Sequence, residues 1–245
     1  MNIENNLDSV KNRILSACKI ANRDSKEITL IAVSKFQSVD KIKTAINLGQ
    51  QHFGENYLQE AINKIQYFKN ISSQNSNQNS KKIFWHFIGD IQSNKTKQIA
   101  ENFDFVHSVN RLKIAQRLNN QRPINELGKL KILIEINVDN EITKSGLDYQ
   151  KEEEILQLCK EILLLENLQL CGFMCIPPAT DDEQLQKLYC QRLAHLLNNV
   201  NAKLSLSLKD LSMGMSNDLE AAICSNATMV RIGTAIFGER QKSKN

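Results

Sequence analysis

The sequence lacks the cysteine patterns that build zinc sites or disulfide frameworks. Its six cysteines include no CxxC pair and no Cys/His cluster with the spacing of zinc ligands. These absences argue against a zinc-binding module and against a small disulfide-rich scaffold, so no metal site is expected. We expect reduced, mostly buried thiols, as in a cytosolic protein.

Long apolar runs and blocks of one charge are also missing. No stretch approaches the ~18 consecutive apolar residues that a membrane helix needs, and the first eight residues have neither a basic nor an apolar region of a secretory signal. The 31 basic and 27 acidic residues are mixed along the chain and give a net charge of +4. A nucleic-acid-binding surface would need a basic block. We therefore expect a cytoplasmic protein that binds neither membrane nor nucleic acid.

Glycine is scarce, and the glycine-rich loops that cradle phosphates are absent. Only nine glycines occur, and neither GxGxxG nor GxxxxGK[ST] is found. A Rossmann sheet, which needs a glycine-rich first turn, is therefore disfavoured. Short β-type runs instead alternate with amphipathic helical stretches, such as the one that Gly49 closes as a C-cap glycine.

Eight of these runs predict strands. Eight strand–helix modules within 245 residues match an α/β protein of the (β/α)8 TIM barrel class. An apolar stripe over Ile3, Leu7 and Val10 predicts an extra N-terminal helix. The asparagine- and serine-rich segment 70–82 is predicted to be a flexible surface loop inside one domain that spans residues 1–245. The predicted strands are Ile28–Ser34, Gln51–Gly54, Ile83–Gly89, Phe103–Ser108, Leu130–Val138, Leu168–Ile176, Asp210–Met215 and Thr228–Phe237.

In such a barrel, functional groups collect where the strands end. Lys35 ends the first apolar run. Such a lysine can simply mark where a strand meets solvent, but a desolvated lysine loses its proton and becomes a nucleophilic amine. A neutral amine forms a Schiff base with an aldehyde, and pyridoxal phosphate is the commonest aldehyde held in this way. Four glycines at strand ends, Gly54, Gly89, Gly214 and Gly233, suit close approach to a ligand and equally suit tight turns.

The last two strand ends form the best phosphate site. Ser216 can cap a following helix while its hydroxyl faces an anion, and Gly233 and Thr234 add backbone amides and a second hydroxyl next to it. An ordinary capped helix without a ligand is the alternative for Ser216. A phosphate after strands seven and eight is the recurring arrangement in these barrels.

Three further polar residues lie inside or beside apolar strands. Arg231 must have a partner, which is either a ligand or a structural ion pair with an embedded acid such as Glu135. His86 fits the interior of the protein as a hydrogen-bonded core histidine better than it fits a site, although both readings remain open.

These strand ends resemble those of the pyridoxal phosphate homeostasis proteins, the YggS/PROSC family. The resemblance covers nearly the whole chain in order. It rests on eight segments: Ala32–Lys35 (AVSK), His52–Tyr57 (HFGENY), Trp85–Gly89 (WHFIG), Gln92–Lys95 (QSNK), Lys144–Gly146 (KSG), Gly172–Ile176 (GFMCI), Leu211–Asp218 (LSMGMSND) and Val230–Gly238 (VRIGTAIFG).

The resemblance implies a barrel similar to the N-terminal domain of alanine racemase, carrying pyridoxal 5'-phosphate as an aldimine on Lys35. By position, Ser216, Gly233 and Thr234 would hold the phosphate and Arg231 would face the pyridine nitrogen. The other cofactor-binding residues expected from the matching segments are Asn56, His86 and Met215.

Two functions compete under this resemblance. One is a carrier or regulator in intracellular vitamin B6 homeostasis, with little or no catalysis and with pyridoxal-phosphate-dependent apoenzymes as partners. The other is a pyridoxal-phosphate-dependent amino-acid racemase, whose second base is a tyrosine from a C-terminal β-domain of the partner subunit. Here the sequence ends seven residues after Gly238, and its four tyrosines show no mark of a base. An arginine at the pyridine nitrogen also disfavours ring protonation. We therefore expect a monomeric carrier without catalytic residues, and a barrel enzyme without a cofactor is a distant third reading.

Overall fold

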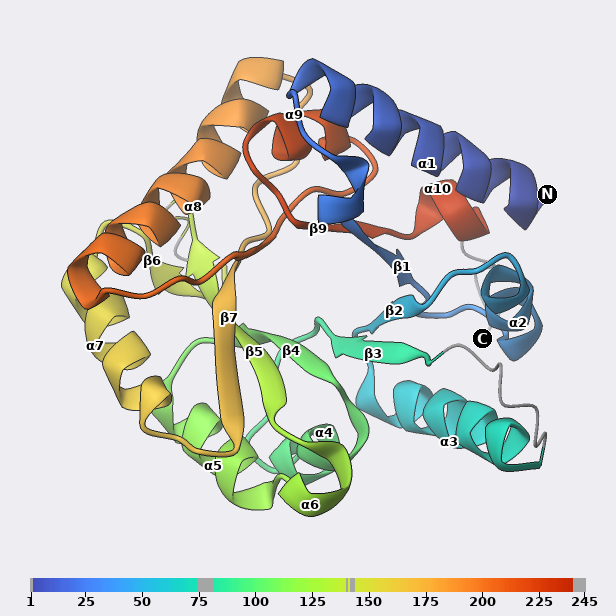
Figure 1. Cartoon of the computed structure of the whole chain (residues 1–245), viewed down its shortest axis with the longest axis horizontal. Helices are drawn as coiled ribbons and strands as arrows, with labels where there is room; N and C mark the ends of the chain where they lie inside the picture. The colour runs from blue at the N-terminus through green and yellow to red at the C-terminus, as the bar shows by residue number, and fades with distance from the viewer. Residues whose placement is uncertain (1, 75–81, 140, 142–143, 240–245) are drawn as a thin grey trace.

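The computed structural model describes residues 2–74, 82–139, 141 and 144–239, and its frame is a closed parallel barrel (Figure 1). Strand β1 pairs with both β2 and β9, and β4 pairs with β5, so the eight barrel strands close into a ring. The barrel strands are β1 (Thr29–Val33), β2 (His52–Glu55), β3 (Phe84–Phe87), β4 (Phe105–Val109), β5 (Leu130–Asn137), β7 (Leu168–Met174), β8 (Asp210–Ser212) and β9 (Met229–Ile232).

Each predicted run overlaps one barrel strand, which confirms the (β/α)8 prediction. The last run is wrong in its second half, because Thr234–Phe237 is helix α10 and not strand. The amide of Phe237 donates to the carbonyl of Gly233 at 2.9 Å, which closes a helical turn. A short apolar run does not distinguish a strand from a buried helical turn. The two-residue strand β6 (Leu147–Asp148), which pairs with β5, was not predicted.

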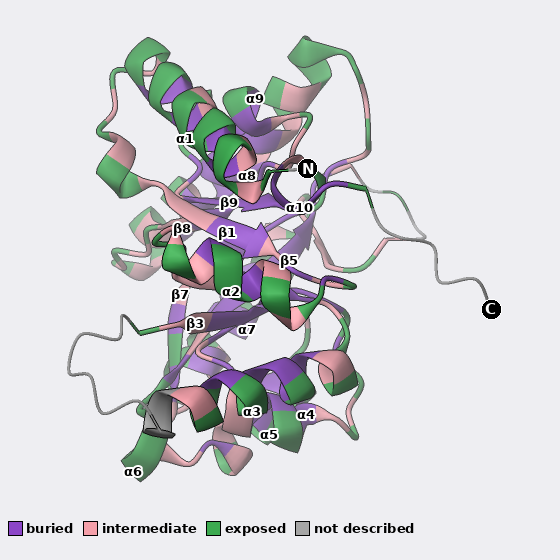
Figure 2. Ribbon diagram, turned by 90° about the vertical axis from the view of Figure 1, so that its right-hand side faces the viewer, coloured by how far each residue is buried: buried purple, intermediate pink, exposed green. Residues whose placement is uncertain are grey.

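Helices surround the barrel with one face buried against the sheet, as the colouring of Figure 2 shows. Gly49 follows helix α2 with φ of +91°, as predicted for a C-cap glycine. The helices are α1 (Ile3–Ile20), α2 (Val39–Asn47), α3 (Leu58–Gln74), α4 (Thr96–Asn102), α5 (Leu112–Gln121), α6 (Ile124–Leu127), α7 (Glu152–Leu163), α8 (Glu183–Leu204), α9 (Leu219–Cys224) and α10 (Thr234–Phe237), with a 3₁₀ turn at Ser25–Glu27.

The predicted surface loop begins later than expected. Helix α3 continues to Gln74, so the first residues of segment 70–82 are helical. Residues 75–81 of that segment lie outside the described residues.

The extra N-terminal helix α1 is confirmed. The side chain of Asn2 caps it by accepting a 2.9 Å hydrogen bond from the amide of Glu4. Its apolar stripe, which includes Leu7, Val10 and Ile14, is buried, and each such side chain stabilises the fold by roughly 1.5–3 kcal/mol. Figure 1 shows α1 lying beside α9 and α10, the two short helices that follow strands β8 and β9.

The core has two layers. The larger layer lies between the sheet and the helices. The smaller one fills the barrel interior with the buried residues Ile31, Phe105, Leu133, Met174 and Met229. All six cysteines are unpaired, and four of them are buried, which agrees with the prediction of reduced thiols.

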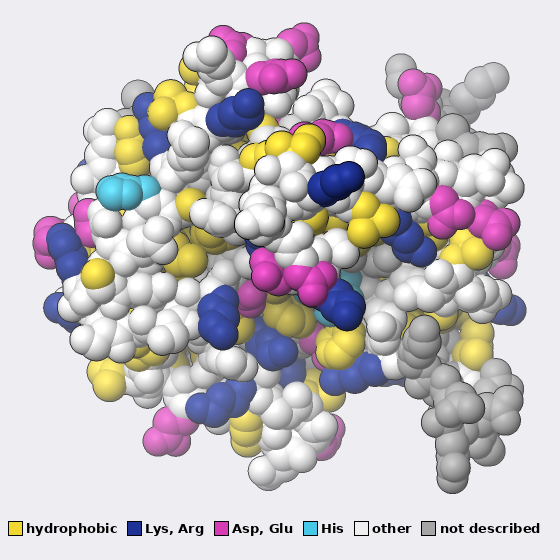
Figure 3. Space-filling view, turned by 45° about the horizontal axis from the view of Figure 1, so that its top comes forward, with side chains coloured by type: hydrophobic (Ala, Val, Ile, Leu, Met, Phe, Trp, Pro, Cys, Tyr) yellow, Lys and Arg dark blue, Asp and Glu magenta, His cyan; other side chains and the backbone are white. Residues whose placement is uncertain are grey.

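Charged side chains of both signs are interspersed over the face shown in Figure 3, around a hollow where hydrophobic side chains are visible. Within the residues that the structure describes, no helix has the length and apolar character needed to cross a bilayer. The described residues also contain no group of three or more His, Cys, Asp or Glu side chains suited to a metal ion.

Candidate functional site

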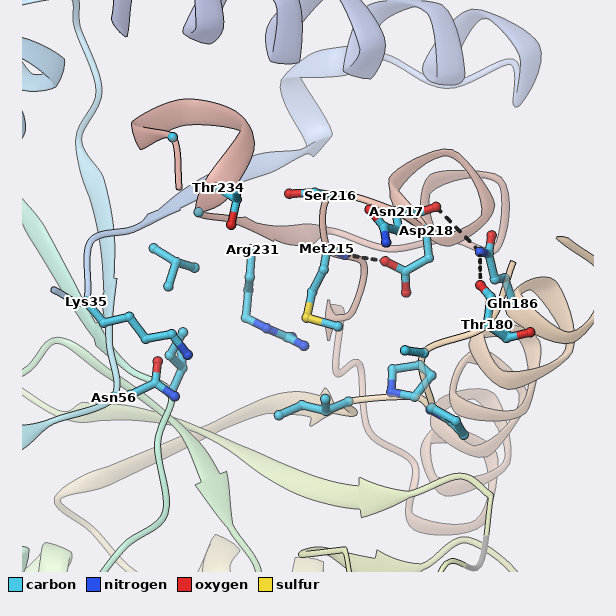
Figure 4. Close-up of a pocket in the computed structure, with 18 of the residues that line it drawn as sticks. Lys35, Asn56, Thr180, Gln186, Met215, Ser216, Asn217, Asp218, Arg231 and Thr234 are labelled. Carbon is cyan, nitrogen blue, oxygen red and sulfur yellow. Dashed lines mark hydrogen bonds between the residues drawn. The ribbon is translucent and has the colours of Figure 1, made fainter. Parts of the chain in front are cut away.

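A pocket of about 310 Å³ opens where the strands β1, β2, β7, β8 and β9 end. It contains seven of the eight residues predicted to bind a cofactor, and Figure 4 shows several of them facing one space. These seven are Lys35, Asn56, Met215, Ser216, Arg231, Gly233 and Thr234.

Lys35 lies in the tight turn that follows β1. The amide of Gln37 donates to the carbonyl of Ser34 at 3.0 Å, and Phe36 has φ of +61°, a conformation that is uncommon for a residue with a side chain. In Figure 4 the amine of Lys35 points into the pocket, above Asn56 and on the side of Arg231. The turn therefore directs the amine into the pocket.

A buried ion pair fixes this turn from below. Lys64 of helix α3 donates to the carbonyl of Ser34 at 2.7 Å and to Oε1 of Glu55 at 2.8 Å. The hydroxyl of Ser34 donates to the same carboxylate oxygen at 2.6 Å. Burial raises the pKa of Glu55, and the charge and hydrogen bond of Lys64 oppose that rise. Because a buried charge needs a partner, this cluster holds Ser34, and with it the neighbouring Lys35, in one position.

Glu60 supports the other side of the turn. Its Oε1 accepts from the amide of Phe36 at 2.6 Å and from Lys64 at 2.5 Å. Sequence reasoning missed both residues. The available signal was the spacing of Glu60 and Lys64 by four residues on a helix whose other inward positions are apolar.

Three predicted residues lie together at the end of β8 and β9. The hydroxyls of Ser216 and Thr234 lie on the same side of Arg231 in Figure 4, and Gly233 lies between β9 and α10. The sequence suggested that Ser216 caps a following helix, but Ser216 is not the N-cap of helix α9. The N-cap is Asp218, whose Oδ1 accepts from the amide of Met215 at 2.6 Å. This bond holds the loop before helix α9 in place.

The glycines at strand ends serve packing more than ligand contact. A Cβ at Gly89 would lie 2.3 Å from the carbonyl oxygen of Asn56, and a Cβ at Gly214 would lie 2.6 Å from the Cβ of Ala222. Of the four, only Gly233 is among the residues that line the pocket. Tight packing of the barrel turns therefore explains Gly54, Gly89 and Gly214.

Arg231 is buried, with 4% of its surface exposed, and reaches into the pocket from β9. Its Nη1 donates to the carbonyl oxygen and to the Oγ of Ser212 at 2.7 and 2.6 Å, and its Nη2 donates to the carbonyl of Cys175 at 2.8 Å. Among the described ion pairs, none joins Arg231 to Glu135. The structural ion pair considered for these two residues is therefore not formed.

His86 is the one predicted site residue that the structure does not place at the pocket. His86 does not line the pocket but lies inside the barrel with no exposed surface. Its ring stacks on Phe105 with centroids 4.3 Å apart and makes hydrogen bonds to His52 and His107. It is the hydrogen-bonded core histidine that the sequence favoured, because its strand position points inward one pleat below the pocket.

The pocket wall opposite Lys35 was the part of the site that the sequence predicted least. It consists of the segment after β7, Ile176–Thr180, together with Gln186 of α8 and Asp218. Gln186 donates to the carbonyl of Thr180 at 2.7 Å, which ties the segment to the helix (Figure 4). The sequence analysis ends a predicted strand at Ile176, but nothing in the pattern indicated that the whole following segment borders the pocket.

The fold and the pocket define a class. The model of the family "Alanine racemase, N-terminal domain" matches residues 5–241. Alanine racemase of Clostridium difficile superimposes with a TM-score of 0.72 over 99% of this chain and 58% of its own, at 17% identity, which shows the shared fold.

Full-length relatives narrow this class. The pyridoxal phosphate homeostasis protein of Haemophilus influenzae is 44% identical over 244 residues, covering 99% of this chain and 98% of its own. That of Escherichia coli K12 is 41% identical over 242 residues, with the same coverage. The chain belongs to the family of pyridoxal phosphate homeostasis proteins. A solved structure of PipY from Synechococcus elongatus, with pyridoxal phosphate bound, is 30% identical and superimposes with a TM-score of 0.78 over 97% of this chain and 100% of its own.

Proposed function

We propose that this protein binds pyridoxal 5'-phosphate through a Schiff base on Lys35 and acts as an intracellular carrier or regulator of that cofactor. The observation that carries the proposal is the pocket itself, in which a lysine amine, a buried arginine and two hydroxyls converge. The names of the full-length relatives and the PipY complex support the same ligand.

The residues present fit this group. An aldehyde needs an amine, which Lys35 supplies, and a phosphate dianion needs hydrogen-bond donors, which Ser216 and Thr234 supply. Asn56 borders the pocket, and its buried Oδ1 has no hydrogen-bond partner within the described chain. An unpaired buried amide is costly, so a polar ligand beside Asn56 would relieve that cost. When bound, the cofactor supplies an electron sink for amino-acid chemistry.

The pocket offers little else for such chemistry. Its ionisable side chains are Lys35, Asp218 and Arg231, and Asp218 is engaged by the amide of Met215. Racemisation needs a second base on the face opposite the lysine. The four tyrosines, Tyr57, Tyr67, Tyr149 and Tyr189, are not among the residues that line the pocket. This favours binding without efficient turnover over the racemase alternative.

Arg231 strengthens this preference. A guanidinium has only donors and stays protonated, so if it faces the pyridine nitrogen it keeps that nitrogen an unprotonated acceptor. An unprotonated ring withdraws electrons weakly. The arrangement suits a protein that holds a reactive aldehyde and passes it to apoenzymes. We also infer that residues 1–245 act as one domain, since the described strands close a single barrel. The expectation of a cytoplasmic monomer is part of the same proposal.

The test is spectroscopic and kinetic. Purified protein mixed with the cofactor and freed of excess by gel filtration should keep a visible absorption band, and Lys35→Ala should not. Racemisation of alanine or serine at an ordinary enzymatic rate, of order 1–10³ s⁻¹, would overturn the carrier assignment in favour of the racemase. A wild-type protein without a band would overturn cofactor binding itself.

A further inference from the structure

Three of the four histidines form one hydrogen-bonded chain inside the barrel. Nδ1 of His52 lies 2.9 Å from Nε2 of His86, and Nδ1 of His86 lies 2.9 Å from Nε2 of His107. Nδ1 of His107 lies 2.9 Å from Oγ of Ser212, the atom that accepts from Nη1 of Arg231 at 2.6 Å. The chain thus joins half-buried His52 to the arginine of the pocket.

Strand register builds this chain. His86 is level with Gly54 of β2 and with Phe105 of β4, so His52 lies one pleat below it and His107 one pleat above. The three histidines therefore lie on neighbouring strands at successive heights in the barrel, and each is within hydrogen-bond distance of the next. The aromatic rings of Phe84 and Phe105 stack on His52 and His86 at centroid distances of 4.6 and 4.3 Å, which keeps the imidazoles in place.

Arg231 determines the direction of donation along this chain of hydrogen bonds. A guanidinium can only donate, so Oγ of Ser212 accepts from it and its own hydrogen is left for Nδ1 of His107. A neutral imidazole that accepts at Nδ1 carries its proton on Nε2 and donates from there. His107 then donates to His86, and His86 donates to His52. In the opposite direction the hydroxyl hydrogen of Ser212, a fully buried residue, would have no acceptor among the described contacts.

Burial disfavours the charged form of all three rings. Burial lowers the pKa of His86 and of His107 well below the ordinary value, and His107 also faces the charge of Arg231. Burial lowers the pKa of His52 as well, with Lys131 acting in the same direction and Asp104 opposing it. The other groups that act on Arg231 are Glu135, Asp218, Cys175 and Cys190.

We propose that His107 is a positioning residue of the pocket, and that its hydrogen bond to His86, and that of His86 to His52, support the tautomer that accepts from Ser212. The chain makes Ser212 Oγ an acceptor aimed at Arg231, and so sets the plane of the guanidinium. Within the described chain, three of its five N–H groups are engaged, by Ser212 and Cys175. The predicted effect on cofactor binding rests on the proposed function, in which Arg231 faces the pyridine ring. The histidine tautomers do not depend on that function.

The first experiment reads the tautomers without any cofactor. In protein labelled with ¹⁵N-histidine at pH 7.5, long-range proton–nitrogen spectra should show His52, His86 and His107 neutral with the proton on Nε2. Exposed His195 provides the internal reference. A proton on Nδ1 of His107, or a charged His107, would overturn the proposed direction.

The second experiment uses three substitutions at one position. His107→Asn keeps an acceptor near Nδ1 for the Ser212 hydroxyl, whereas His107→Gln and His107→Phe do not. Cofactor affinity and the visible band should stay near wild type in the first variant. In the other two, affinity should fall about tenfold, the effect of one charge-assisted hydrogen bond, and the band should shift. His195→Phe is the matched control.

Two outcomes separate the proposal from the function on which it rests. Wild-type affinity and an unshifted band in folded His107→Gln would overturn the positioning role while cofactor binding stands. If all three substitutions at position 107 disturb binding equally, a merely structural role explains the histidine and the positioning role fails. Absence of any band in the wild type would overturn the function, and the tautomer spectra would still decide the direction of the chain.

Discussion

Glu135 carries a charge that the barrel interior disfavours. It is 5% exposed, and its Oε2 has no hydrogen-bond partner within the described chain. Burial raises its pKa to about 7, the charge of Asp90 adds to the rise, and Arg231 opposes it. Since this value lies above the ordinary 4.5, the folded state binds the proton more tightly than the unfolded state. The contribution is fully present below pH 4.5 and is lost as the pH rises through about 7.

The pH dependence of stability tests this directly. Between pH 5 and pH 8, the free energy of unfolding should fall by on the order of 3 kcal/mol through this group. Glu135→Gln is neutral at both values and should lack that component. Urea unfolding of both proteins at the two pH values isolates the difference. Equal changes in the two proteins would contradict the account.

Ser216 and Thr234 are the residues most directly open to test in the pocket. Both hydroxyls lie on one side of the pocket, and hydrogen bonds to a charged group contribute about 1.5–3 kcal/mol each. We therefore expect each alanine substitution to weaken cofactor retention roughly tenfold or more, and the double substitution to weaken it further. Equilibrium dialysis measures the effect. Ser207→Ala, in the connection before β8, is a control for hydroxyl loss, and wild-type retention in the double variant would place the phosphate elsewhere.

Chemistry at the residue scale was partly predictable. Lys35 and Arg231 are conspicuous because each is a charge at the end of, or within, an apolar strand. His86 has the same appearance, but only the depth of its strand position shows that it lies below the pocket. The roles of Glu60 and Lys64 were not predicted, because they depend on the packing of helix α3 against the turn after β1.

At the scale of elements, helix α1 connects to the loops on the proposed phosphate side. Arg13 donates to the carbonyl of Ser216 at 2.8 Å and to both carboxylate oxygens of Glu220 at 2.7 and 2.8 Å. Asn6 donates to the carbonyl of Ile236 in α10 at 2.9 Å. One helix outside the repeating strand–helix modules therefore fixes both loops that carry the predicted hydroxyls.

The substitution Arg13→Met tests whether helix α1 holds the Ser216 loop in place. We expect cofactor retention to fall several-fold because the Ser216 loop loses its anchor, while the free energy of unfolding changes by less than about 1 kcal/mol, as for partly exposed ion pairs. Arg117→Met is the matched control, since Arg117 of α5 donates to the carbonyl of Ser93, which does not line the pocket. Dialysis and urea unfolding give the two quantities. Retention equal to that of the control would contradict the role of α1.

Helices and strands could be predicted only where a local sequence pattern marks them. The apolar stripe of α1 and the glycine after α2 have the spacing and the position that their roles require, and both predictions hold. Helix α10 was missed because Ile236 and Phe237 are buried in either conformation, so the apolar pattern does not distinguish them. Strand β6 is too short to show a period.

At the scale of the whole molecule, the alternation of strands and helices indicated the barrel, but closure depends on long-range pairing. The pairs between β1 and β9, such as Ile31 with Arg231, join residues from opposite ends of the chain. Register of this kind brings Arg231 beside the turn of Lys35 and aligns the three histidines. No local pattern encodes it, which is why the pocket residues were predictable as a set of strand ends while the chain of hydrogen bonds beneath them was not.

Lys35 is proposed to carry the cofactor covalently. The most direct test of this proposal is borohydride reduction of the protein mixed with pyridoxal phosphate, followed by intact mass and peptide mapping. We expect the mass increase of one reduced cofactor on the peptide that contains Lys35, and no increase in Lys35→Ala. Stable modification of a different lysine in the wild type, or full labelling of Lys35→Ala, would contradict it.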